Sequence, residues 1–268
     1  FGNISMLTGV LCLAGMGWAV KCNNPKRWVL LLGLGAIGGV LGSLFSGSRG
    51  GWVGLPIVLW VLYRGYGHEL APRAKIGALI VIVVGGLTVY SVPPLGVKQR
   101  VHQAVDDIQR YVSGESRTSS VGARFEMWKG ASQLIIEKPI LGWGSNGYQQ
   151  GMHALGEAGI IDAGVAHYGH AHNDFIDATA KRGILGLIAL VLLYLVPMQL
   201  FMRQLRTSNL VLRSLAVAGA LLPVTYIDFG LSQVFLVHNS GVMIYTFWLV
   251  VLWGSFRACQ LKLGKDTS

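Results

Sequence analysis

A short polar segment gathers side chains that could transfer protons. It runs His167-Tyr168-Gly169-His170-Ala171-His172-Asn173-Asp174. Asn173 and Asp174 are both residue types that cap helices, and Gly183 is suited to end the helix that would follow. His172 would then stand just before the positive end of a helix, which disfavours imidazolium and keeps the ring neutral near pH 7. The segment therefore predicts a general base, His172, beside backbone N–H groups that can bind an anion.

Two other interpretations of this histidine segment remain open. The histidines could simply form hydrogen bonds within a loop. The order His170-Ala171-His172-Asn173-Asp174 also imitates the H-x-H-x-D core of metallo-β-lactamase-like hydrolases, with His167 as a further ligand. Position 175 is Phe where that family has His, and no Cys or Glu cluster completes a tetrahedral ligand set. We therefore expect no metal and no other cofactor.

Two arginines could stabilise negative charge on a substrate. Arg49 lies between two apolar runs, where an arginine costs free energy unless it is paired or functional. Arg124 precedes Phe125, Trp128, Ser132 and Ile135, whose spacing predicts an amphipathic helix on the membrane surface. Interfacial snorkelling of Arg49 and simple solvation of Arg124 remain the alternatives.

A glycine-rich segment supplies neither a nucleophile nor a phosphate-binding loop. It runs Gly142-Trp143-Gly144-Ser145-Asn146-Gly147. The five residues from Trp143 fail the G-x-S-x-G nucleophile pattern at its first position. The segment also lacks the G-K-[ST] ending of a phosphate-binding loop. We interpret it as a turn that re-enters the membrane interface.

The elements that must position these residues are membrane helices. Hydrophobic residues make up 52% of the 268-residue chain and charged residues 13%, against roughly 25% charged residues in soluble domains. Apolar runs that could cross about 30 Å of hydrocarbon occupy residues 2–20, 28–46, 76–92, 184–202, 210–227 and 233–256, and a shorter apolar run occupies 51–63. We therefore predict an all-α, polytopic transmembrane helix bundle with about seven spans. The G-x-x-x-G spacings Gly35/Gly39 and Gly38/Gly42 predict close helix packing in the second run.

The polar residues between the fourth and fifth runs form one large loop. Twelve basic and two acidic residues lie in the connections on one side of the membrane, whereas the nine basic and nine acidic residues of the loop cancel. By the positive-inside rule the loop faces the periplasm. We therefore predict transmembrane helices 1–4 in residues 1–92, a periplasmic catalytic loop in 93–183, and helices 5–7 with a cytoplasmic tail in 184–268. The net charge of +10 then reflects topology, and nucleic acid is not an expected partner.

Several motifs resemble the O-antigen ligase/polymerase superfamily of polytopic membrane glycosyltransferases, and bacterial O-antigen ligases in particular. They are Ser48-Arg49-Gly50, Arg124 with Trp128, Pro139-Ile140-Leu141-Gly142-Trp143-Gly144, and His172-Asn173 followed after nine residues by Gly183-Ile184-Leu185-Gly186. The resemblance covers about residues 28–202. The H-N-x9-G-x-x-G spacing is its most specific part.

The resemblance implies an O-antigen ligase in the inner membrane of a Gram-negative bacterium, with a periplasmic active site. The donor would be a glycan on undecaprenyl pyrophosphate, the acceptor would be a sugar hydroxyl of the lipid A core, and no metal ion would take part. His172 would be the catalytic base, and the substrate-binding residues would be Arg49, Arg124, His170 and Asn173. Members usually have more spans than this chain contains, so we expect further N-terminal spans to be missing.

The identity of the acceptor separates an O-antigen ligase from an O-antigen polymerase and from a protein O-oligosaccharyltransferase. These residues do not distinguish the three. A lipid-linked glycan transporter is the alternative from a different class. Transporters usually place ionisable residues at mid-membrane and contain repeated halves, whereas this chain gathers its polar groups in one loop and has His238 as its main ionisable candidate within a span. We therefore favour an enzyme.

Overall fold

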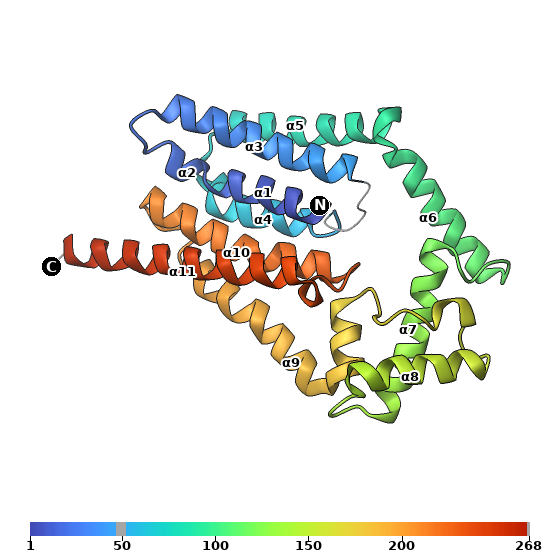
Figure 1. The fold of residues 1–268 in the computed structure, drawn as a ribbon. Helices are drawn as coiled ribbons and strands as arrows, with labels where there is room; N and C mark the ends of the chain where they lie inside the picture. Colours follow the sequence, from blue (N-terminus) through green and yellow to red (C-terminus); the bar gives the residue numbers. More distant parts are fainter. Residues whose placement is uncertain (47–51, 267–268) are drawn as a thin grey trace. The chain divides into compact units, whose positions relative to one another are not determined.

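The computed structural model describes residues 1–46 and 52–266 (Figure 1). Every regular element within these residues is a helix, which confirms the predicted all-α fold. The helices form two compact units. Unit 1 comprises residues 1–75, 192–229 and 235–268, and unit 2 comprises residues 76–191 and 230–234.

Among the described residues, five helices are long and apolar enough to cross a membrane. They are α3 (Pro25–Phe45), α5 (Pro72–Ser91), α9 (Asp174–Met202), α10 (Leu210–Gly230) and α11 (Asn239–Asp266). These helices match five of the seven predicted runs. The chain is therefore a multi-pass membrane protein, as predicted.

The other two predicted spans form shorter helices. The run at 2–20 becomes α1 (Gly2–Ala14) and α2 (Met16–Ala19), separated by Gly15 (φ −72°, ψ −8°). The run at 51–63 becomes α4 (Leu55–Gly65), whose 11 residues rise about 16 Å, roughly half the hydrocarbon thickness. Neither run forms a full-length span as a single helix; the first is divided at Gly15, and in the second the helix begins at Leu55, with a proline in its first turn.

Close packing in unit 1 follows one of the two predicted glycine spacings. A Cβ atom on Gly39 of α3 would lie 2.5 Å from Cα of Gly9 in α1. A Cβ atom on Gly35 would lie 2.7 Å from Sγ of Cys12, which is also in α1. This contact confirms the Gly35/Gly39 prediction. Gly38 has nothing within 4 Å, so the second spacing contributes only through Gly42. Helix α10 is the most enclosed of the candidate spans, because 78% of the residues in its most apolar stretch are buried.

A buried arginine lies at the start of α10 in unit 1. Arg213 is 1% exposed and donates through Nη2 to Oε1 of Glu69 at 2.6 Å. Its Nε donates to the carbonyl of Thr207 at 2.7 Å. Glu69 ends a 3-10 turn, η1 (Gly67–Glu69), and its side chain is 53% exposed. The guanidinium thus joins two connections to the end of one helix.

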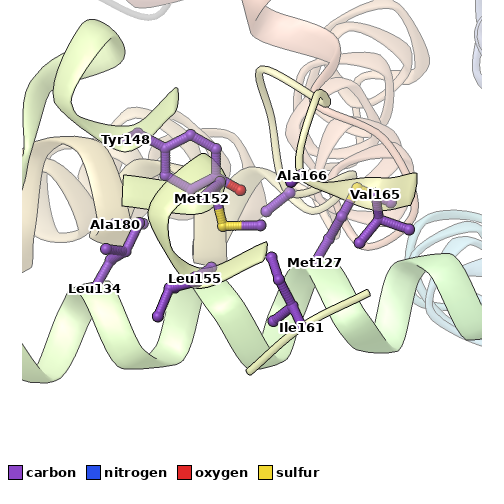
Figure 2. Packing of buried hydrophobic residues seen from close by; sticks show 11 residues of the cluster. Met127, Leu134, Tyr148, Met152, Leu155, Ile161, Val165, Ala166 and Ala180 are labelled. Atoms are coloured by element: carbon purple, nitrogen blue, oxygen red, sulfur yellow. The ribbon is translucent and has the colours of Figure 1, made fainter. Parts of the chain in front are cut away.

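Unit 2 is built from α5, α6 (Val97–Val112), α7 (Ser120–Glu137), α8 (Gly144–Glu157) and the first part of α9. Short 3-10 turns, η2 (Pro93–Leu95) and η3 (Ala163–Val165), lie between these helices, and a further turn, η4 (Phe235–Val237), precedes α11. The hydrophobic core lies between α7, α8 and the segment after α8 (Figure 2), and its larger members are Met127, Leu134, Tyr148, Met152, Leu155, Ile161 and Val165.

Helix α7 forms where an amphipathic helix was predicted, but its apolar face packs against protein. Met127, Ala131 and Leu134 are buried in the core of unit 2, and Trp128 and Ile135 are partly buried against that core. The buried face of α7 therefore lies beside the predicted stripe, and contact of Trp128 and Ile135 with the membrane surface stays a prediction. An apolar stripe at helical spacing has the same pattern whether lipid or protein covers it.

Helix α9 is interrupted at Gly183, where the predicted helix was expected to end. Gly183 has φ 64° and ψ −165°, so the helical backbone stops there and resumes at Ile184. A Cβ on Gly183 would lie 2.0 Å from the carbonyl oxygen of Ile140. The backbone N–H of Trp143 donates to Ala180 at 3.0 Å. Gly142 and Trp143 thus fit against the interruption, whereas residues 144–147 of the predicted turn form the first turn of α8.

Candidate functional site

The N-terminus of α9 is capped by Asn173, which is 8% exposed. Its Oδ1 accepts hydrogen bonds from the backbone N–H groups of Phe175 at 3.0 Å and Ile176 at 3.1 Å. Its Nδ2 donates to the carbonyl of Leu231 at 3.2 Å. The first two bonds confirm the predicted cap. The third ties the start of α9 to the segment after α10, a contact that was not predicted.

His172 lies directly before this cap in a left-handed conformation. Its φ is 48°, and no other non-glycine residue in the described ranges has a positive φ. Its Nδ1 lies 2.8 Å from Oε1 of Gln233. With that oxygen as the acceptor, Nδ1 carries the ring hydrogen, and Nε2 is the nitrogen of the neutral ring that can accept a proton. This pairing leaves Nε2 as the ring nitrogen for a general base.

The neighbouring aromatic side chains pack around His172. The His170 ring meets the His172 ring edge to face, with 4.3 Å between centroids and 83° between planes. The Tyr168 ring lies 5.9 Å from His172 and 4.2 Å from His167. Within the part of the chain that the structure describes, no three His, Cys, Asp or Glu side chains are grouped so that they could hold a metal ion. The geometry of these side chains thus does not support the H-x-H-x-D interpretation.

A buried ion pair holds the backbone before His172. Nζ of Lys181 lies 2.8 Å from Oδ1 of Asp177, and the two side chains are 6% and 1% exposed. Lys181 also donates to the carbonyl of Gly169 at 2.8 Å. The backbone N–H of Ala171 donates to Asp177 at 3.0 Å, and its carbonyl accepts from Nε1 of Trp128 at 2.9 Å. The histidine loop is therefore fixed by side chains of α7 and α9.

Tyr148 completes the environment of this ion pair. Its ring centroid lies 5.0 Å from Nζ of Lys181, a cation–π contact inside the core of unit 2. Burial raises the pKa of the Tyr148 phenol well above its ordinary value, and the nearby charge of Asp177 raises it further. The phenol therefore stays neutral, and Asp177 supplies the negative charge that offsets Lys181.

Of the two predicted arginines, only Arg124 lies within the residues that the structure describes. Arg124 lies on α7, one helical turn before Trp128, so the two side chains share a face of that helix. Nε1 of Trp128 donates to the carbonyl of Ala171, so the helix that carries Arg124 contacts the histidine loop. Arg49 lies outside the described residues.

A buried carboxyl group in unit 1 is a further candidate that the sequence did not single out. Asp228 lies near the end of α10 and is 5% exposed. A Cβ on Gly54 would lie 2.7 Å from its carboxylate carbon, so backbone approaches it closely. Within the described residues its Oδ1 has no hydrogen-bond partner. An ionisable residue buried in a membrane span is commonly functional.

Sequence reasoning also missed the residues that support His172. Asp177 and Lys181 have the acid-to-base spacing of four residues that favours an ion pair on a helix, so this signal was available. Gln233 lies 61 residues from His172, and no local pattern indicates that contact.

Comparison with known proteins identifies the family. A family model described as O-antigen ligase matches residues 34–191, which include α7, the histidine loop and the capped start of α9. A protein of Haemophilus influenzae, described only as uncharacterized, is 34% identical over 206 residues, covering 77% of this chain and 52% of the relative. The chain thus spans about half the length of that relative. The matched residues contain the histidine loop, the Asp177–Lys181 ion pair and the Asn173 cap, whereas Gln233 and Leu231 lie beyond them, and the chain belongs to the O-antigen ligase family of glycosyltransferase-like membrane enzymes.

Proposed function

We propose that the chain carries the catalytic site of an O-antigen ligase, which transfers a glycan from undecaprenyl pyrophosphate to a sugar hydroxyl of the lipid A core. The observation that carries this proposal is the geometry of His172, which lies directly before the capped N-terminus of α9 with its Nδ1 2.8 Å from Oε1 of Gln233. A base next to the helix that carries Arg124 suits a donor with a pyrophosphate leaving group. The reaction would take place on the periplasmic side of the inner membrane, opposite the connections that carry most basic residues.

In the proposed reaction the acceptor hydroxyl oxygen attacks the anomeric carbon of the donor sugar. A carbon–oxygen bond forms there as the bond from that carbon to the pyrophosphate oxygen breaks. The proton of the hydroxyl passes to Nε2 of His172, and undecaprenyl pyrophosphate leaves with the bonding electron pair. General-base assistance of this kind contributes about 10²–10⁴-fold to the rate.

Arg49 and Arg124 would stabilise the charge on the departing pyrophosphate. A guanidinium donates two parallel hydrogen bonds to phosphate oxygens, which the single ammonium group of lysine does not reproduce. Arg49→Lys and Arg124→Lys should each lower the transfer rate although the charge is kept, and should change the melting temperature little. Full activity in both variants would leave the two arginines as ordinary interfacial charges.

The decisive experiment is transfer by the purified protein with His172 replaced by Ala. The variant should lose about 10²–10⁴-fold in rate while it elutes like the wild type on size exclusion. His167→Ala is the matched control, because His167 is exposed and its ring contacts Tyr168 rather than His172. Wild-type turnover by His172→Ala would overturn the base assignment, and Asp174 or Asp177 would become the next candidate.

Two additions to the same assay test the finer parts of the proposal. EDTA should leave the rate unchanged, since the two arginines would offset the pyrophosphate charge. Loss of activity on chelation, restored by Zn²⁺ or Mn²⁺, would instead support a metal held by the histidine segment. An acceptor panel of lipid A core, a second lipid-linked glycan and a pilin-like protein would separate ligase from polymerase and from protein O-oligosaccharyltransferase. Movement of the donor across the membrane without turnover would indicate a transporter.

A further inference from the structure

Helix α6 of unit 2 carries an apolar stripe that is exposed along its whole length. Val101, Val105, Ile108 and Val112 are 45%, 47%, 43% and 80% exposed. Their spacing of four, three and four residues places them on one face of the helix. None of the residues of α6 is buried. The stripe is thus a continuous apolar surface on an otherwise charged helix.

The other faces of α6 are polar, and one of them contacts α7. Tyr111 donates to Oε1 of Glu126 at 2.8 Å, and its ring lies 5.1 Å from that of Phe125. The backbone N–H of Val121 lies 3.4 Å from a carboxylate oxygen of Asp107. These contacts fix one side of α6 to α7 and leave the apolar stripe uncovered. The face opposite the stripe carries residues suited to water, which include Gln99, Asp106 and Arg110.

The position of α6 in the chain indicates what covers the stripe. Helix α5 has a mean hydropathy of 1.9, and none of the residues in its apolar window is buried, so its surface faces lipid if it crosses the membrane. Only residues 92–96 separate its end from the start of α6. Gly96 (φ 63°) turns the chain at that point, and Figure 1 shows α6 leaving α5 at an angle. Helix α6 therefore begins where a lipid-facing span ends.

We propose that α6 lies in the interface of the membrane that α5 crosses, with the stripe of Val101, Val105, Ile108 and Val112 in the acyl boundary. An amphipathic helix that follows a span with few intervening residues buries its apolar face between headgroups and acyl chains. Lys98, Arg100 and Arg110 against Asp106 and Asp107 give α6 a net charge of +1, so apolar contact rather than charge drives the binding. The interfacial helix then anchors α7, which carries Arg124 and Trp128, at the depth of lipid headgroups.

This inference is tested by measuring what each face of α6 contacts in the full protein. Single cysteines at Val101, Val105 and Ile108, and at the opposite positions Gln99, Asp106 and Arg110, are spin-labelled after the native Cys12, Cys22 and Cys259 are replaced. The protein is held in nanodiscs of phosphatidylethanolamine and phosphatidylglycerol. Collisions with oxygen, which concentrates in lipid, are compared with collisions with a water-soluble nickel chelate. The stripe should favour oxygen and the opposite face should favour nickel.

Two other results would overturn the inference. Equal nickel accessibility on both faces would place α6 in water, and protection of the stripe from both reagents would place protein, such as a second copy of this chain, over it. A charge variant gives an independent check. Ile108→Asp should raise nickel accessibility at position 101, because the charged side chain resists burial in the acyl boundary, whereas Gln99→Asp on the polar face should not. An unchanged collision profile in Ile108→Asp would also contradict the proposal.

Discussion

Each unit of the molecule contains a buried cation that pairs with an acid and binds a backbone carbonyl. In unit 2 the cation is Lys181, whose partner Asp177 is as buried as the lysine itself. In unit 1 the cation is Arg213, whose partner Glu69 is 53% exposed. The two arrangements look alike as ion pairs but hold different backbone. The first fixes the loop before a left-handed histidine, and the second fixes an ordinary turn, so burial of a charge does not by itself mark the functional site.

Of the substitutions that test this comparison, loss of the acid in unit 2 should have the largest effect on stability and on transfer. Asp177→Ala leaves the Lys181 ammonium buried without its partner, which typically costs about 3–5 kcal/mol of stability. It also removes the acceptor of the Ala171 N–H, so the histidine loop should shift and transfer should be lost. Melting temperature and transfer rate of the purified variant measure the two effects.

A double variant separates stability from positioning at this pair. Asp177→Ala/Lys181→Met removes the uncompensated charge and should recover part of the melting temperature. Transfer should stay low, because Gly169 and Ala171 still lack their side-chain partners. Recovery of both stability and transfer would show that the pair only supports folding.

The corresponding change in unit 1 should affect stability without affecting chemistry. Arg213→Met removes the donor to Thr207 but leaves a carboxylate that is already half in water, so we expect a loss of about 1–3 kcal/mol. The transfer rate per folded molecule should remain that of the wild type. A large fall in this rate with the fold intact would contradict the claim that only the ion pair of unit 2 supports the chemistry.

Two helix caps provide a smaller and closely matched test. Asn173 caps α9, and Asn209 caps α10 in unit 1 by accepting from the N–H of Leu212 at 3.0 Å. Replacing either by Ala should cost about 1 kcal/mol. Only Asn173→Ala should also lower transfer, because Asn173 adjoins His172 and binds Leu231. Equal transfer in both variants would argue against a role of the cap in orienting the histidine.

The smallest expected effect is a pH dependence at Glu69. The hydrogen bond from Arg213 lowers the pKa of the Glu69 carboxyl below its ordinary value. A lowered folded pKa means that the contribution to stability is present above the unfolded pKa and is lost as pH falls through the folded pKa. The wild type should therefore lose slightly more melting temperature than Glu69→Gln between pH 7 and pH 4. Solvent screening keeps the difference small, and a larger loss in Glu69→Gln would contradict the assignment.

The sequence predicted the parts of the fold and site that depend on local signals. Apolar runs located the long helices, and residue types located the Asn173 cap and the interruption at Gly183. Contacts between distant segments were not predictable in this way, and neither Gln233 nor Leu231 has a local feature that points to the histidine loop. Helix α7 was located, but its buried face of Met127, Ala131 and Leu134 was not, because hydrophobic periodicity does not identify what covers a helix.

The left-handed conformation of His172 sets the stability of the protein against its proposed chemistry. An L-residue with a Cβ atom pays roughly 1–2 kcal/mol to adopt this backbone, whereas glycine adopts it without strain. Glycine at this position would therefore relax the loop while it removes the imidazole. Selection of variants for heat resistance alone would favour this change and would yield a well-folded membrane protein that lacks the proposed catalytic base. Stabilisation of this enzyme by directed evolution consequently needs an activity screen at every round.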